Sequence, residues 1–203
     1  MNSTWIGFDF LSNTPLTFNQ EYSIILACKG DNRTMDNNKY IFILSGAAGA
    51  GKSTLANKLK NNSPKYISPI VEICEADDYW YLIGNGKYAF DMKLLHNAHC
   101  WCQNKADNLM RNGENLIVSN TNIKSRDRKP YFQFAKEYGY KVVFIHLKTQ
   151  FKSIHNVPED VVKRMRDCYE SPNSWEQSLI VKGSEMSDDL AHLLDECGVE
   201  YEF

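Results

Sequence analysis

The fold is decided by Tyr40-Ile-Phe-Ile-Leu-Ser-Gly46-Ala-Ala-Gly-Ala-Gly-Lys52-Ser-Thr54. Residues 40–44 are apolar on both faces, which is typical of a strand buried inside a parallel sheet. After the glycines, the helical spacing of Leu55, Ala56 and Leu59 predicts a helix. The stretch therefore predicts a buried strand, a glycine-rich loop and a helix in direct succession.

The loop matches the pattern G-x-x-x-x-G-K-[ST] at Gly46, Gly51, Lys52 and Ser53. Its glycines let backbone N–H groups turn inward around an anion, and the following helix presents its positive end to that anion. In this pattern the lysine reaches the β- and γ-phosphates and the serine hydroxyl coordinates Mg²⁺. We therefore expect the chain to bind a nucleoside triphosphate, ATP, together with Mg²⁺. The nucleotide-binding residues are Gly46, Ala47, Ala48, Gly49, Ala50, Gly51, Lys52, Ser53 and Thr54.

Outside this loop, predicted strands and helices alternate along the chain. Strands are predicted at 70–74, 116–119 and 142–145, and helices at 91–111, 125–138, 158–170 and 187–197. Repeated alternation of this kind implies an α/β fold with a parallel sheet in three α/β/α layers, as in P-loop NTPases of the adenylate-kinase-like type.

The N-terminal part of the chain has a different character. Residues 4–28 alternate loosely between apolar and polar residues and predict a β-hairpin, whereas residues 29–39 are polar and rich in turn formers. We therefore expect a small N-terminal extension over residues 1–38, made of the hairpin and a linker. Residues 39–203 would then form the P-loop domain.

Composition excludes several classes of protein. The net charge of −2 gives no global attraction to nucleic acid. No run of about 18 apolar residues is present, so no membrane span is expected, and the first residues do not resemble a secretory signal. Six cysteines spread through predicted elements fit reduced thiols in the cytoplasm. His96, His99, Cys100 and Cys102 superficially suggest a metal site, but the two cysteines point about 200° apart on a helix, which favours helix packing.

An acidic pair, Asp77 and Asp78, follows the second predicted strand. Ligands of such sheets bind at the carboxyl ends of the strands, where a carboxylate can accept the proton of an attacking hydroxyl. We predict that Asp77 is the catalytic base and that Asp78 caps the next helix or contacts the substrate. Because the Asn-Lys-x-Asp motif of GTPases is missing, these features favour a kinase.

Several motifs together resemble a known family. Ser-Gly-x-x-Gly-x-Gly-Lys-Ser-Thr, Ala-Asp-Asp-Tyr, Ser-x-Thr-Asn and Ala-Lys-Glu-Tyr-Gly-Tyr are similar to the kinase half of phage polynucleotide kinase–phosphatase and to related P-loop ATPases. The likeness covers about residues 41–170. It implies Asp77 as general base, Lys52 and Ser53 on ATP and Mg²⁺, and Thr121 and Asn122 in the acceptor pocket. It also implies 5′ ends of single-stranded DNA or RNA as partners.

The chain departs from the family at three places. Ser119 and Asn120 stand where the relatives place an aspartate on the third strand, and Trp80 replaces an arginine that contacts nucleic acid. The lid segment before Val157-Pro158 is shortened, with Lys152-Ser153 in place of Arg-Asn. Transition-state charge would then be met by a lid candidate, Lys152 or Arg164, by Arg126, or by no residue of the chain.

Two local features of the sequence each allow two interpretations. Residues 120–122 either line an acceptor pocket or cap the next helix. The basic cluster 124–129, which includes Arg126, either holds phosphates of the substrate or forms a solvated helix turn.

Three functions follow from the sequence. The first is an ATP- and Mg²⁺-dependent kinase for a polynucleotide 5′-hydroxyl. The alternatives are a small-molecule or protein kinase of the same fold and a non-catalytic nucleotide-binding protein.

Overall fold

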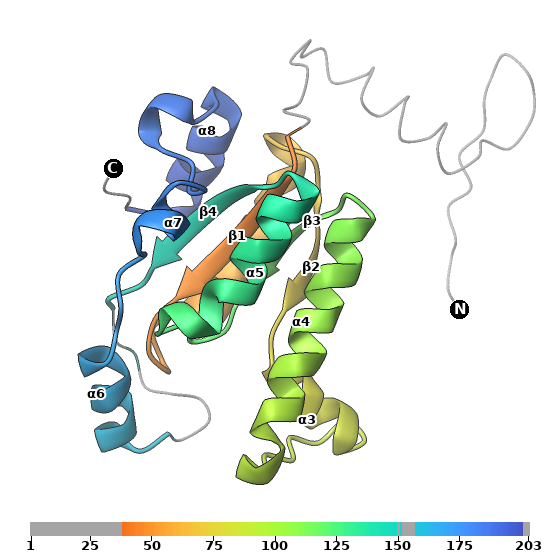
Figure 1. The fold of residues 1–203 in the computed structure, drawn as a ribbon, viewed down its shortest axis with the longest axis vertical. Coiled ribbons are helices and arrows are strands. Elements are labelled where there is room, and N and C mark those ends of the chain that lie inside the picture. Colours follow the sequence, from red (N-terminus) through yellow and green to blue (C-terminus); the bar gives the residue numbers. More distant parts are fainter. Residues whose placement is uncertain (1–37, 150, 152–156, 201–203) are drawn as a thin grey trace, which may run out of the picture. The chain divides into compact units, whose positions relative to one another are not determined.

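A computed structural model describes residues 38–149, 151 and 157–200 (Figure 1). The predicted N-terminal hairpin and nearly all of the 1–38 extension lie outside these residues, and so does Lys152. In the part of the chain that is described, no helix has the length and apolar character needed to cross a membrane.

The centre of the domain is a four-stranded parallel sheet in the order β2-β3-β1-β4. Its strands are β1 (Tyr40–Ser45), β2 (Ile70–Cys74), β3 (Asn115–Val118) and β4 (Lys141–His146). All six residues of β1 are buried, as expected for a strand with neighbours on both edges and helices on both faces. The strands predicted from the sequence are therefore confirmed to within a residue or two.

Helices cover both faces of the sheet. Helices α4 (Leu95–Arg111) and α5 (Ser125–Tyr138) lie side by side on one face (Figure 1), over a core that includes Ile41, Ile43 and Val118. Helices α2 (Lys52–Asn62) and α8 (Asp188–Cys197) pack in a second core with Phe42 and Ile117. The predicted three-layer α/β/α P-loop fold is confirmed.

Shorter elements complete the domain. They are α3 (Asp77–Ile83), α6 (Glu159–Asp167), α7 (Ser174–Gln177) and the 3₁₀ turns η1 (Ser63–Lys65), η2 (Met92–Leu94) and η3 (Gly183–Glu185).

Local signals in the sequence explain several boundaries. The Asp91 side chain accepts a hydrogen bond from the Lys93 N–H and begins η2, which continues into α4. Gly139 and Gly198 end α5 and α8 in the left-handed conformation, which a residue with a Cβ adopts at a cost. The helix predicted over 158–170 is shorter than expected, because α6 ends at Asp167.

Candidate nucleotide-binding and phosphotransfer site

The phosphate loop connects β1 to α2 at the carboxyl edge of the sheet. Gly51 has a left-handed backbone, with φ of 90°, and supplies no side-chain cap, so it leaves the amides of the first turn of α2 uncapped. Gly46 has φ of 152°, and a Cβ at this residue would lie 2.8 Å from the Leu147 carbonyl oxygen. The loop is thus built from glycine where the backbone is left-handed or crowded, and its uncapped amides suit an anion.

Backbone contacts hold the loop on both sides. The Gly46 N–H donates to the Thr121 carbonyl at 2.9 Å, and the Phe151 N–H donates to the Gly49 carbonyl at 2.8 Å. On the same side the Thr149 hydroxyl donates to the Ala50 carbonyl at 3.0 Å. The loop is therefore fixed between the end of β3 and the segment that follows β4.

Lys52 is folded over its own loop. Its Nζ donates to the carbonyl oxygens of Gly46 and Ala47 at 3.0 and 2.9 Å, and the residue is 9% exposed. Burial lowers the pKa of Lys52 to about 8, while the negative charges of Glu75 and Asp77 act in the opposite direction. A bound phosphate would supply the negative charge that this buried ammonium lacks.

Ser53, the predicted Mg²⁺ ligand, has a partner that the sequence motifs did not indicate. Its hydroxyl donates to the Glu75 carboxylate at 2.9 Å. Glu75 comes directly after β2 and before the acidic pair. Its position at a strand end was the signal in the sequence, but only the two aspartates resemble the family pattern there.

The structure gives Asp77 and Asp78 different surroundings. Asp77, the first residue of α3, accepts a hydrogen bond from the Tyr88 hydroxyl at 3.2 Å, and its charge acts on Lys52. Burial, together with the Asp77 carboxylate, raises the pKa of Tyr88 to about 12. Asp78 accepts from Lys105 of α4 at 3.3 Å. Asp77 therefore belongs to the phosphate-loop side, whereas Asp78 belongs to the α3–α4 contact.

The turn after β3 is tied into the fold. The Asn120 side chain accepts from the Ala76 N–H at 2.8 Å, and the Asn122 amide donates to the Leu44 carbonyl at 2.7 Å. Asn122 is 2% exposed and has a left-handed backbone, with φ of 46°. Thr121 is partly exposed beside the phosphate loop. Of the two predicted acceptor residues, Thr121 has the side chain nearer to solvent.

Within the basic cluster 124–129, one arginine is buried and another is exposed. The Arg128 guanidinium is fully buried and pairs with Glu176 through two hydrogen bonds of 3.1 Å. Arg126 instead has a side chain 80% exposed and lies 3.6 Å from the carboxylate of Asp127. Only Arg126 of these two arginines can meet a substrate.

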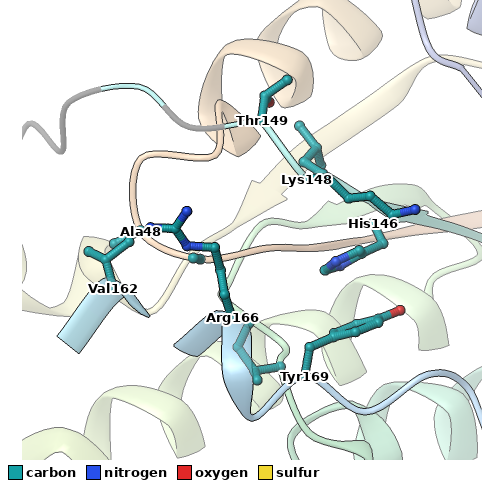
Figure 2. A pocket seen from close by; sticks show the side chains of 10 residues that line it. Ala48, His146, Lys148, Thr149, Val162, Arg166 and Tyr169 are labelled. Atoms are coloured by element: carbon teal, nitrogen blue, oxygen red, sulfur yellow. The ribbon is translucent and has the colours of Figure 1, made fainter. Parts of the chain in front are cut away.

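The two arginines of helix α6 have different surroundings. The predicted lid candidate Arg164 lies 3.8 Å from Asp160, and both side chains are 73% exposed. Arg166 instead lines a cavity of about 240 Å³ with Ala47 and Ala48 of the phosphate loop. Figure 2 shows the Arg166 guanidinium directed toward Ala48. Arg166 is thus the arginine of α6 that reaches the phosphate loop, and the sequence patterns gave no sign of it.

The other wall of this cavity comes from the end of β4. The rings of His146 and Tyr169 stack with centroids 3.7 Å apart (Figure 2), and His146 Nδ1 lies 3.1 Å from the Ser45 hydroxyl. Burial lowers the pKa of His146, so the neutral ring is favoured. An aromatic wall beside a phosphate loop can pack against the flat face of a nucleotide base.

Burial clarifies two other features of the sequence. Trp80 is 1% exposed and packs edge-on against Phe90, with ring centroids 5.1 Å apart, so it is a core residue. Within the His96–Cys102 patch, Cys102 is fully buried in the core with Ala98, which is the behaviour of a helix-packing residue. Across the described ranges no group of three His, Cys, Asp or Glu side chains is arranged to hold a metal.

Parts of known proteins are similar to this chain in sequence. The human NEDD4-binding protein 2 is 34% identical over 140 residues, which are 64% of this chain and 8% of that protein. The 2′,3′-cyclic-nucleotide 3′-phosphodiesterase of Pongo abelii is 28% identical over 121 residues, which are 59% of this chain and 26% of that protein. This chain therefore corresponds to a small part of each relative.

Several solved structures align with most of this chain. APE1195 aligns with a TM-score of 0.50 and 19% identity, covering 81% of this chain and 98% of that one. The Mycobacterium tuberculosis APS kinase CysC bound to AMPPNP and APS aligns with a TM-score of 0.48 and 13% identity, over 78% and 98% of the two chains. The Pnkp1/Rnl/Hen1 complex aligns with a TM-score of 0.43 and 22% identity, over 78% and 46%.

The family of the chain follows from a match to a family model. The family described as AAA domain matches residues 41–155, from β1 and the phosphate loop to the segment beyond β4. Because the match spans more than half of the sequence and contains the phosphate loop and the parallel sheet around it, the chain belongs to the AAA domain family and has a P-loop fold.

Proposed function

We propose that this chain is an ATP- and Mg²⁺-dependent kinase that phosphorylates the 5′-hydroxyl of a polynucleotide. The observation that carries the proposal is the position of Asp77, which begins α3 beside the phosphate loop and acts electrostatically on Lys52. A kinase needs a carboxylate near the cation that binds the transferred phosphate, because the acceptor hydroxyl must lose its proton there.

The residues of the site divide the work of phosphoryl transfer. The loop amides and Lys52 hold the phosphates of ATP, and Ser53 would hold Mg²⁺, which when bound neutralises charge on the phosphate oxygens. Asp77, oriented by the Tyr88 hydroxyl, accepts the proton of the acceptor. Arg166 approaches the loop from α6 and can neutralise charge that develops during transfer.

The polynucleotide acceptor is supported by the resemblance over residues 41–170 and by an aromatic side chain near Asp77. Tyr81 lies one helical turn after Asp77 on α3 and is 45% exposed. Its ring contacts Tyr88, the residue that donates to Asp77, at a centroid distance of 5.3 Å. An exposed ring at this place can stack on a nucleobase next to the reacting hydroxyl.

A second candidate is a kinase with a small-molecule acceptor. The burial of Arg128 removes one cation from the basic cluster that would hold polynucleotide phosphates. This observation weakens the nucleic-acid interpretation without affecting ATP binding or the role of Asp77.

Labelled ATP and 5′-hydroxyl DNA or RNA oligonucleotides test the proposal. We expect label transfer to the oligonucleotide, with Asp77→Asn lowering the rate by about 10²- to 10⁴-fold while ATP affinity is kept. Asp78→Asn is the matched control, because it removes a carboxylate from the same helix turn, and its effect should be much smaller.

Two results would count against the proposal. If ATP binds but no oligonucleotide is labelled, the polynucleotide acceptor is wrong, and nucleosides and sugars become the substrates to screen. If Asp77→Asn and Asp78→Asn reduce transfer equally, Asp77 is not the base.

A further inference from the structure

Glu75 and Ser119 follow neighbouring strands and lie beside each other at the edge of the sheet. Cys74 of β2 is paired with Val118 of β3, and the Ser119 N–H donates to the Cys74 carbonyl at 3.0 Å. The next residue on each strand is Glu75 and Ser119. The parallel register therefore brings a carboxylate and a hydroxyl together next to the phosphate loop.

Both side chains belong to the face of the sheet that α2 covers. Along β3, Val118 lies in the core under α4 and α5, while Ile117 lies in the core under α2. Alternation along a strand places Ser119 on the same face as Ile117. Ile73 also packs in the α2 core, and the contact of Glu75 with Ser53 of α2 confirms the same face for Glu75.

The Ser119 hydroxyl is buried and unpartnered within the described part of the chain. Ser119 is 6% exposed, and its Oγ is buried with no hydrogen-bond partner among the described residues. An unpaired buried hydroxyl is unfavourable, and an ion or water that belongs to the site is one explanation for such a group in a native protein. Mg²⁺ keeps several water molecules when it binds a protein, and these are suitable partners for such a hydroxyl.

The donors near Ser119 suit Mg²⁺. This ion takes oxygen ligands, commonly one or two carboxylates together with substrate phosphates and water. The Ser53 hydroxyl and the Glu75 carboxylate are 2.9 Å apart, so one ion can be shared between them.

We propose that Glu75, at the end of β2, is the carboxylate that holds the Mg²⁺ of the bound nucleotide, with Ser53 as its partner and Ser119 beside them. The inference rests on the proposed function to the extent that nucleotide binds with Mg²⁺. It assigns to β2 the carboxylate that the resembling families carry on β3, where this chain has Ser119 and Asn120.

Metal affinity in the nucleotide complex tests this assignment independently of phosphoryl transfer. Mn²⁺ is titrated into protein saturated with AMPPNP and followed by electron paramagnetic resonance. Calorimetry then gives the AMPPNP affinity with and without Mg²⁺. For Glu75→Gln we expect Mn²⁺ affinity to fall about 10-fold or more, while metal-free AMPPNP affinity is kept or improves because negative charge near the phosphates is removed.

Two further variants make the test specific. Glu72→Gln removes a carboxylate from the same strand, whose partners are Lys60 and Lys105, and should keep the wild-type Mn²⁺ affinity. The exchange Glu75→Ser with Ser119→Asp moves the carboxylate to β3 and should recover most of the affinity lost in Glu75→Gln.

The outcomes separate this inference from the proposed function. If wild-type protein does not bind AMPPNP, the nucleotide function itself is wrong. If AMPPNP binds and Glu75→Gln keeps the wild-type Mn²⁺ affinity, only the assignment of Glu75 is overturned. If the exchange variant folds but stays as weak as Glu75→Gln, the two positions do not serve the same ion.

Discussion

Replacing Glu176 with glutamine is expected to destabilise the protein by about 3–5 kcal/mol, because it leaves the Arg128 guanidinium charged and unpaired in the core. Both side chains are fully buried. The guanidinium donates twice to Glu176 at 3.1 Å and once each to the carbonyl oxygens of Asn122 and Ile123 at 3.2 Å. The glutamine keeps the two hydrogen bonds to the backbone intact and loses the opposite charge.

The expected loss is large relative to the total free energy of unfolding of such a domain. Domains of this size have free energies of unfolding of about 5–15 kcal/mol, and 1 kcal/mol shifts Tm by about 2–4 °C. We therefore expect Tm to fall by about 6–20 °C. The double variant Arg128→Met with Glu176→Leu removes both charges and should be much closer to wild type than Glu176→Gln alone.

Urea unfolding followed by tryptophan fluorescence measures this effect. Trp175 precedes Glu176 and packs against Phe132 at a centroid distance of 6.1 Å, so its emission reports on this part of the core. Asp160→Asn breaks an exposed ion pair instead and should leave the midpoint nearly unchanged. A loss below about 1 kcal/mol for Glu176→Gln, or a double variant as unstable as the single one, would refute the reasoning.

Two further predictions concern the phosphate loop. Gly46→Ala should abolish measurable ATP binding by calorimetry, because the added Cβ would lie 2.8 Å from the Leu147 carbonyl oxygen; unchanged affinity would show that the loop relaxes freely. Arg166→Ala should lower the rate of phosphoryl transfer by about 10³-fold with little change in ATP affinity, and Arg164→Ala should have the smaller effect. Equal effects in single-turnover assays would contradict the orientation of α6.

The sequence predicted those features that depend on local patterns. The glycine pattern from Gly46 to Ser53 predicted the loop, and apolar runs predicted the strands, because a buried parallel strand is apolar on both faces. The periodic helix ending at Arg111 was also predicted correctly at its C-terminus. These signals lie within about 20 residues of the chain and need no knowledge of tertiary contacts.

Other features of the site depend on contacts between distant residues. Arg128 looked like a surface cation beside Arg126, but its partner Glu176 is 48 residues away and its burial follows from how α5 and α7 pack. The choice between Arg164 and Arg166 depends on which face of α6 meets the phosphate loop. Periodicity alone does not decide between them, because Arg164 and Arg166 flank the apolar stripe of the helix on opposite sides.

The turn after β3 contacts both the phosphate loop and the start of the helix that carries Asp77. Asn120 holds the Ala76 N–H at the start of α3, where Asp77 lies, and the Thr121 carbonyl holds the Gly46 N–H of the phosphate loop. Arg128 in turn donates to the Asn122 carbonyl. One three-residue turn thus connects the predicted base, the loop and the buried ion pair. Neither Asn120 nor Asn122 caps α5, whose N-cap is Lys124, so the capping interpretation of these residues is wrong and their side chains instead tie the turn to α3 and β1.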